Sequence, residues 1–522
     1  ISKSNSEKNT QEGISYTMSN DNKRLIKTII ISGLSAVISY LINFFLTSYI
    51  SENVGIDAYG FVAIAKTAVS YAQIITVALT TFIVRYISIS YHRGEIDKAN
   101  SYYSSSVMAC VTLSGIIYLF AIIMITKLEF ILKIPAGLTE AVKALFLLVF
   151  LNFVITTVTT PLNAGCFIKN RLDLSGILKI ISYLVDAAVL IIVFKLWVPS
   201  IWVVGLGSVV SSFVLAAGLW GMKRRLVPEL VFKKRLVSFR RVWEMMSNGI
   251  WQSVNSLGNV LNSGLDLIVS NLMLTGIETG QVAAVKTIGT MFSMLYQIVN
   301  QPFQPKMLRV YSNGSTDDFV SELGKSMKIC GFFSNVAFAG FVALGWTYYK
   351  LWLPSQDTEV LYLLTVIAVF GSIAEGIAQP MYFVNTLTLK KMIPCFVTLG
   401  SGFINTVSMY ILLKYTDIGV YAIVLTTAVI MSCVNLIFNP IYCAHCLKIN
   451  PWRLYKTIIR HIISVVLQII VFKALTCIYN PSNWITLILM GCVMVLVGMV
   501  IHILVMTNGN EKKRILNKLK LS

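Results

Sequence analysis

Charged residues are scarce in this chain of 522 residues, where they make up 13%, against roughly 25% in an ordinary globular domain. Hydrophobic residues make up 56%, and the mean hydropathy is +0.74. This composition excludes a soluble protein. A helix that crosses a bilayer needs about 20 mostly apolar residues, and fourteen such stretches leave no room for a folded catalytic domain outside the membrane. The sequence therefore predicts an all-α polytopic membrane protein.

Recognisable catalytic and metal-binding motifs are also missing. No Gly-x-x-x-x-Gly-Lys-Ser/Thr motif is present, so we expect no nucleotide-driven motor within the chain. HExxH motifs and nucleophile elbows are absent, and the four histidines are scattered. Cys443, His445 and Cys446 form a close cluster in an expected cytoplasmic loop, but a structural zinc site needs four ligands and no second pair follows. We therefore expect a transporter and no enzyme, without a metal or cofactor.

Acidic residues are few, 23 against 43 Lys and Arg, and the formal net charge is +20. Such a charge can indicate nucleic-acid binding, but these cations are spread over short loops between apolar spans. Most of them fall on one side when both termini are placed in the cytoplasm, as the positive-inside rule requires. The sequence thus predicts a protein of the bacterial cytoplasmic (inner) membrane, with both termini cytoplasmic and no nucleic-acid partner.

The fourteen spans divide into two lobes and a final pair. The expected spans are 25–50, 59–84, 104–126, 141–163, 175–196, 201–222, 247–274, 280–304, 323–346, 360–386, 394–413, 418–441, 457–478 and 484–506. The expected domains are a disordered cytoplasmic tail (1–22), a first lobe of six spans (23–222), a basic cytoplasmic linker (223–246), a second lobe of six spans (247–441), a C-terminal helix pair (442–506) and a basic cytoplasmic tail (507–522). The linker is expected to lie at the anionic inner leaflet.

An internal duplication explains the two lobes. Residues 60–67 match residues 280–287 at five of eight positions, both beginning with Gly and ending in Lys-Thr. Pro161 and Pro380, which are expected to end spans four and ten, are separated by a closely similar distance along the chain. Two copies of six spans enter the membrane in the same sense, so they should be related by an axis along the membrane normal, with a binding site between them.

Polar side chains recur on one face of span seven. Asn248, Gln252, Asn255, Asn259, Asn262 and Asp266 follow at intervals of three or four residues, which places them on one helical face. Such a face can serve helix packing, but a continuous row of carboxamides favours a water-filled cavity. Spans two and eight carry similar rows that include Gln73 and Gln297.

Ionisable residues within spans are candidates for function because burying a charge in hydrocarbon is costly. Lys66 and Lys286 occupy matching positions, and they either extend to the outer interface or face a cavity where they hold an anionic group. Asp266 lies at a similar depth to Lys286 and can pair with it. Asp186 and Glu375 are candidates for H⁺ or Na⁺ coupling or for structural ion pairs. Arg24, Lys27 and Arg85 are expected at the inner mouth.

Three short stretches carry a family resemblance. They are Gly55-Ile-Asp57-Ala-Tyr59-Gly60, Arg85 followed by Gly94-Glu-Ile-Asp97-Lys-Ala-Asn100, and Thr160-Pro161 leading to Lys169-Asn-Arg171. With six, six and two spans, the chain resembles the Wzx-type lipid-linked oligosaccharide flippases over residues 20–510. These form part of the polysaccharide-transport branch of the multidrug/oligosaccharidyl-lipid/polysaccharide exporter superfamily.

The resemblance implies a flippase that moves undecaprenyl-pyrophosphate-linked repeat units from the cytoplasmic to the periplasmic or outer leaflet by alternating access, for O-antigen or capsule synthesis. We expect a monomer, because one pair of lobes already encloses a site. Membrane lipids and polysaccharide polymerase machinery are the implied partners. In this hypothesis Arg24, Lys27 and Arg85 capture the pyrophosphate, and Lys66 and Lys286 hold it further out. Family cavities are net cationic, whereas the spans here hold two basic and three acidic residues. An ion-coupled multidrug exporter is the alternative; a membrane-embedded polymerase or ligase fits the short outer loops less well.

Overall fold

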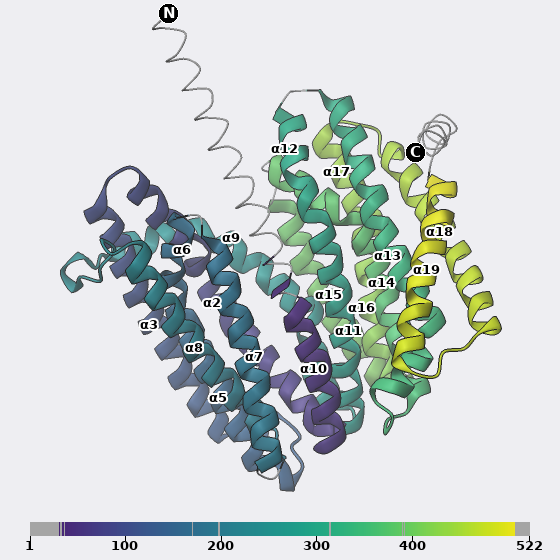
Figure 1. Ribbon diagram of the computed structural model, residues 1–522, viewed down its shortest axis with the longest axis horizontal. Coiled ribbons are helices and arrows are strands. Elements are labelled where there is room, and N and C mark those ends of the chain that lie inside the picture. Colours follow the sequence, from purple (N-terminus) through teal and green to yellow (C-terminus); the bar gives the residue numbers. More distant parts are fainter. Residues whose placement is uncertain are drawn as a thin grey trace, which may run out of the picture. The chain divides into compact units, whose positions relative to one another are not determined.

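The computed structural model describes residues 31, 34–35, 37–169, 171–196, 199–312, 315–388, 390 and 392–506, and these residues form helices and loops without a strand (Figure 1). Helices suit a membrane because they satisfy every backbone hydrogen bond within one segment. The predicted all-α architecture is confirmed. Arg24, Lys27 and both expected terminal tails lie outside the described residues.

The first half of the chain begins, among the described residues, with a helical stretch that includes residues 37–53. Its helices are α2 (Ile56–His92), α3 (Ile96–Thr126), α4 (Leu128–Ile131), α5 (Thr139–Thr159), α6 (Ala164–Ile168), α7 (Leu172–Leu196), α8 (Trp202–Leu226) and α9 (Phe239–Ser263). Short 3₁₀ turns lie at Ala136–Leu138, Thr160–Asn163 and Lys234–Leu236.

The second half contains α10 (Leu265–Met273), α11 (Gly276–Asn300), α12 (Gln304–Ser312), α13 (Thr316–Trp352), α14 (Thr358–Leu387), α15 (Met392–Tyr415), α16 (Tyr421–Cys433), α17 (Asn439–Leu447), α18 (Trp452–Ile478) and α19 (Trp484–Met506). A 3₁₀ turn at Gln301–Phe303 precedes α12, and a π turn at Val434–Phe438 joins α16 to α17.

The helix starts repeat along the chain, which supports the predicted duplication. Five helices of the first half have a counterpart that starts 219 or 220 residues later. The paired starts are Ile56 with Gly276, Ile96 with Thr316, Thr139 with Thr358, Leu172 with Met392, and Trp202 with Tyr421. Among the described helices, none starts 219 or 220 residues before α18, and the two final helices, α18 and α19, lie where the appended pair is expected.

Twelve helical segments among the described residues are long and apolar enough to cross a membrane. Two expected spans are not among them. Residues 25–50 lie partly outside the described chain, and 247–274 are helical in α9 and α10 but too polar to qualify. Fourteen crossings therefore remain a prediction.

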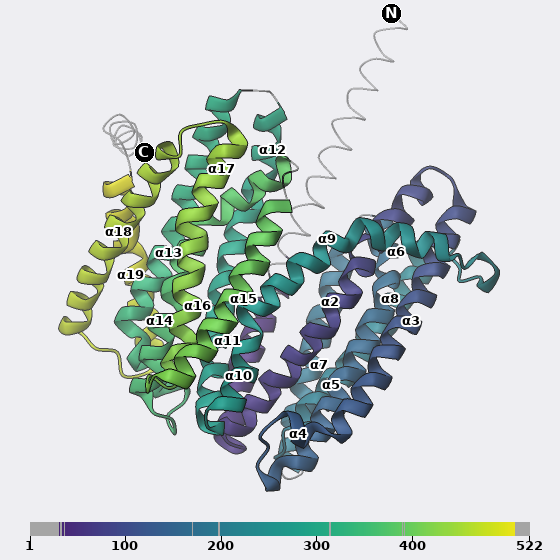
Figure 2. The ribbon, with the colours of Figure 1, turned by 180° about the vertical axis from the view of Figure 1, so that it is seen from behind.

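The described residues pack as two units. The first comprises those up to Val54 together with Ala65–Ser256, and within it α8 packs against α5 and α7. The second comprises Gly55–Ile64 together with the residues from Leu257 onward. Its centre is α13, which packs against α14 and α18 (Figures 1 and 2). The first turns of α2 thus belong with the second unit, and the expected linker 223–246 belongs with the first.

Three prolines affect their helices differently. Pro161 lies in the 3₁₀ turn that follows α5, whereas Pro380 lies inside α14, which continues past it to Leu387, within one residue of the expected end of span 360–386. Pro440 follows the π turn, and its missing N–H cannot serve the carbonyl of Leu436 four residues earlier. The hydroxyl of Tyr455 in α18 donates to that carbonyl instead, at 2.9 Å.

Candidate functional site

The duplicated motif begins at a close contact between α2 and α11 inside the second unit. A side-chain carbon on Gly60 would lie 3.2 Å from the backbone nitrogen of Gly280, and one on Gly280 would collide with the carbonyl oxygen of Ile56. The hydroxyls of Tyr59 and Thr287 lie 3.0 Å apart beside this contact. Only glycine permits such an approach of two helix backbones. The two copies of the motif therefore meet at their glycines.

The start of α11 is stabilised locally by a capping box. The hydroxyl of Thr275 accepts from the backbone N–H of Glu278 at 3.3 Å, and the Glu278 carboxylate accepts from the backbone N–H of Thr275 at 2.9 Å. This arrangement satisfies two donors that a helix start leaves open. It fixes where α11 begins, and Lys286 then follows about three turns later.

Lys286 lies in an ion pair. Its ammonium is 3.1 Å from Oδ2 of Asp266 and also donates to the carbonyl of Ser263. Ser263 ends α9 and Asp266 lies in the first turn of α10, so the ammonium binds where the helix is interrupted at Gly264. The Lys286 side chain is 25% exposed and that of Asp266 is 7% exposed. The second copy of the motif therefore presents a cation that is partly neutralised.

Lys66 is exposed, and its ammonium has no hydrogen bond or ion pair within the described part of the chain. Asp186 in α7 is an acidic group close enough to interact with it electrostatically. Asp186 packs against Gly207 of α8 and is only partly buried. The first copy thus presents a cation whose donors are available to an anion.

Helix α2 carries further polar side chains beyond Lys66. Gln73 and Arg85 are both exposed, and the Arg85 guanidinium lies 5.9 Å from the centre of the Phe82 ring. The hydroxyls of Ser70 and Thr80 donate to carbonyls of their own helix. This back-bonding makes hydroxyls cheap to bury, so Gln73 and Arg85 join Lys66 as exposed polar side chains of α2 that are open to a ligand.

The amides of α9 divide into two groups. Asn259 is exposed and Asn255 is half-buried. Asn262 is 3% exposed; its side-chain nitrogen donates to the carbonyls of Gly258 and Thr398, at 2.9 and 2.8 Å. It therefore joins α9 to α15 and does not share the open face that the spacing suggested.

Glu375 in α14 has both carboxylate oxygens engaged. Oε2 accepts from the hydroxyl of Ser293 in α11 at 2.9 Å, and Oε1 accepts from the amide of Gln379 at 3.1 Å. Gln379 lies one turn after Glu375 in α14. This spacing is visible in the sequence, but on its own it does not predict that the two side chains form a hydrogen bond. Gln297, one turn beyond Ser293, is exposed. Both oxygens of the Glu375 carboxylate are thus hydrogen-bonded within the second unit.

Two of the four histidines lie side by side, although neither was predicted as a site residue. The rings of His461 in α18 and His502 in α19 are 5.3 Å apart. His502 Nε2 lies 3.0 Å from the carbonyl of Lys328, and the amide of Asn335 donates to the His461 carbonyl at 3.0 Å. These bonds attach the C-terminal pair to α13. No group of three or more His, Cys, Asp or Glu in the described chain is placed to hold a metal ion.

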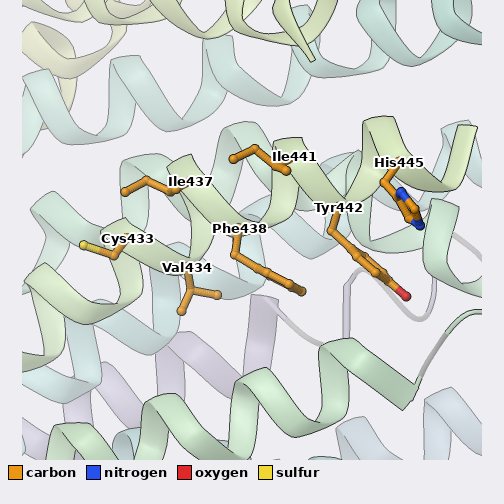
Figure 3. A pocket seen from close by; sticks show the side chains of 7 residues that line it. All are labelled: Cys433, Val434, Ile437, Phe438, Ile441, Tyr442 and His445. Atoms are coloured by element: carbon orange, nitrogen blue, oxygen red, sulfur yellow. The ribbon is translucent and has the colours of Figure 1, made fainter. Parts of the chain in front are cut away.

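An apolar hollow of about 560 Å³ lies along α16, the π turn and α17. Figure 3 shows its lining side chains, which are Cys433, Val434, Ile437, Phe438, Ile441, Tyr442 and His445. None of the predicted site residues lines it. The expected loop around Cys443 is the helix α17, and Cys443 and Cys446 are buried in it, so that expectation was wrong.

The sequence is similar to a known protein family and to a bacterial protein. Residues 25–307 match the family described as "Polysaccharide biosynthesis protein". The "Uncharacterized membrane protein EpsK" of Bacillus subtilis (strain 168) is 26% identical over 485 residues, which cover 93% of this chain and 96% of that protein.

Solved structures share the fold. A structure of the lipid II flippase MurJ in an inward closed conformation has a TM-score of 0.66 at 13% identity and covers 91% of this chain and 99% of its own. An inward-facing multidrug resistance MATE family transporter of the MOP superfamily has a TM-score of 0.65 at 11% identity and covers 80% and 99%. Together with the twelve spans, these findings describe a multi-pass protein of the bacterial cytoplasmic membrane with a MOP-type fold.

Proposed function

Because the chain belongs to the polysaccharide biosynthesis protein family, we propose that it is a flippase for undecaprenyl-pyrophosphate-linked oligosaccharide repeat units. It moves them from the cytoplasmic to the periplasmic or outer leaflet by alternating access, and the product serves O-antigen or capsule synthesis. The fold shared with a lipid II flippase supports this proposal. The protein works as a monomer and hands its product to polysaccharide polymerase machinery.

The observation that carries the proposal is the cation at matching positions of the two motif copies. A pyrophosphate needs cationic donors, and Lys66 has its donors free while Lys286 retains a partly exposed ammonium. We assign the pyrophosphate to these two lysines. Arg85, with Arg24 and Lys27, captures the head group from the cytoplasmic leaflet.

The sugars are assigned to the exposed amides. Gln73, Asn255, Asn259 and Gln297 can donate to and accept from sugar hydroxyls. Asn262 is left out of this set because its amide is engaged in the contact with α15. The lipid tail needs only hydrocarbon and can remain in the bilayer.

The test combines deletion of the gene with complementation. Deletion is expected to cause repeat units to accumulate on undecaprenyl pyrophosphate and surface polymer to be lost. Lys66→Ala should then fail to restore polymer, whereas Lys179→Ala, which removes an exposed lysine of α7 outside the proposed site, should restore it. Full transport by a Lys66→Ala/Lys286→Ala protein would exclude the assignment of the head group.

An ion-coupled multidrug exporter is the second candidate, favoured by the MATE-like fold and by the carboxylates within spans. Asp186 is the strongest candidate for H⁺ or Na⁺ coupling, because it is partly exposed and has no hydrogen-bonded partner in the described chain; Asp266 and Glu375 are already engaged. Deletion that leaves surface polysaccharide unchanged but increases sensitivity to cationic drugs would favour this candidate.

A further inference from the structure

The segment between α8 and α9 is bound along its backbone by one face of α3. We call residues 231–238 the strap. Four polar side chains of α3, of which three are fully buried, hydrogen-bond the strap's backbone. The bonds are Val231 N to Asn100 Oδ1 (2.8 Å), Lys233 N to Ser104 Oγ (2.9 Å), Ser238 N to Ser105 Oγ (2.9 Å) and Ser101 Oγ to Leu236 O (2.9 Å). The strap therefore has a defined conformation although it contains only a single 3₁₀ turn.

The same attachment continues into the first turns of α9. The hydroxyl of Tyr102 donates to the carboxylate of Glu244 at 2.8 Å, and Arg241 lies over the Tyr102 ring and bonds the same carboxylate. Further along, the Asn248 amide donates to the Tyr86 hydroxyl at 2.8 Å. The strap and the start of α9 thus form one surface fixed to α2 and α3 (Figure 2).

The outward side of this surface combines cations with large apolar groups. Lys233, Lys234, Arg235 and Arg240 are exposed, and none has an acidic partner in the part of the chain that the structure describes. Phe239 is 79% exposed and Trp243 is 62% exposed, with Phe232 beside the lysines. Water alone does not favour exposed aromatic rings next to unpaired cations, so this face is suited to a partner that is both anionic and apolar.

The position in the chain identifies that partner. Leu226 ends a helix that is long and apolar enough to cross the membrane, and it lies five residues before Val231, the strap's first backbone contact with α3. We therefore place this face at the bilayer surface. Aromatic side chains favour the head-group region, and basic side chains next to membrane helices attract anionic lipids. We propose that this face binds the anionic glycerophospholipids of the cytoplasmic leaflet, with Lys233, Lys234 and Arg235 on lipid phosphates and Phe239 and Trp243 among the head groups.

The hydrogen bonds from α3 give the proposal its physical basis. A solvated basic loop would lose conformational freedom on binding a lipid, whereas the strap is already ordered by contacts inside the protein. Binding to the folded form then stabilises the first unit by mass action. This surface is independent of the transported substrate, so the proposal does not rest on the flippase assignment.

Brominated lipids provide the test, because a bromine atom in contact with a tryptophan side chain quenches its fluorescence. The full chain is placed in discs of phosphatidylcholine and phosphatidylglycerol at one composition, with bromine on either lipid. The difference between the wild-type protein and Trp243→Phe gives the quenching at Trp243. We expect phosphatidylglycerol to quench several-fold more, and added salt to reduce this preference because it screens surface charges.

Two charge-matched variants decide the outcome. Lys233→Gln/Lys234→Gln/Arg235→Gln should remove the several-fold preference at Trp243, because basic side chains next to membrane helices attract anionic lipids. Lys390→Gln/Lys448→Gln/Lys456→Gln removes the same charge at other exposed positions and should keep it. The strap variant retains every backbone bond to α3, so it should fold. Equal quenching by both lipids in the wild-type protein, or equal loss in the two variants, would overturn the proposal.

Discussion

Lys66 and Lys286 occupy the same place in two copies of one motif, yet their surroundings differ. Lys66 is exposed and has no hydrogen-bonded partner in the described chain, whereas Lys286 is held by Asp266 and by the Ser263 carbonyl. The residue that corresponds to Asp266 in the first copy is Leu46, which cannot form an ion pair. Duplication therefore preserved the cation, while the second copy also has a partner that neutralises it. We infer that Lys66 serves the ligand and that Lys286 serves the ligand and the fold.

The largest expected effect is a difference in stability between variants of the two lysines. Lys286→Met leaves the Asp266 carboxylate buried without its cation, which should lower the free energy of unfolding by about 3 kcal/mol. Lys66→Met removes an exposed charge and should change it by no more than about 0.5 kcal/mol. Thermal unfolding of the purified proteins measures both. The matched control is Lys286→Met/Asp266→Asn, which should recover at least half of the loss; equal destabilisation by both single variants would show that the two environments are alike.

A second comparison concerns the glycines that begin the two motifs. Gly280→Ala forces a methyl group against the carbonyl of Ile56, which belongs to a helix backbone and cannot yield, and should cost about 2 kcal/mol. Gly60→Ala meets its nearest atom at 3.2 Å and should cost less. The control is Gly289→Ala in the same helix, where nothing lies within 4 Å and alanine should stabilise by roughly 0.5 kcal/mol. If Gly280→Ala unfolds at the temperature of Gly289→Ala, the helices do not meet as described.

The smallest effect should distinguish two amides of α9 that lie about one turn apart. Asn262→Ala leaves buried groups of α15 without their donor and should cost about 1.5 kcal/mol. Asn259→Ala removes an exposed side chain, so we expect little change in stability but reduced transport. Unfolding and polymer assays on the same pair of variants provide the measurements, and the reverse pattern would contradict the division of this face into packing and ligand-binding residues.

Hydrophobic length and the internal repeat predicted much of this fold. The expected span 394–413 falls within α15, and the matches around Gly60 and Gly280 agree with five pairs of helix starts. The resemblance to polysaccharide-transport flippases is confirmed by the family match. These features succeeded because they depend on local periodicity and on similarity between two parts of one chain.

The parts that the sequence did not reveal depend on partners far along the chain. Helical spacing placed Asn262 on a polar face but could not show that Thr398 and Ser401 would face it from α15. Likewise the serines of α3 appeared as part of an ordinary span, and nothing local showed that they would bind a segment about 130 residues later. Periodicity identifies which side chains share a face, whereas contact between distant helices decides what that face meets.

The attachment of the strap to α3 also has a consequence for the order of synthesis. A ribosome adds about 5–20 residues per second, and the contacts of α2 and α3 with the strap are complete once the start of α9 has been made. Gly60, in contrast, packs against Gly280, which is synthesised 220 residues later. We therefore expect the first unit to form its contacts before the first turns of α2 meet their partner. At the fastest rate of synthesis, about ten seconds separate the synthesis of Gly60 from that of Gly280. During this time the first turns of α2 are the natural target of a membrane chaperone or quality-control protease.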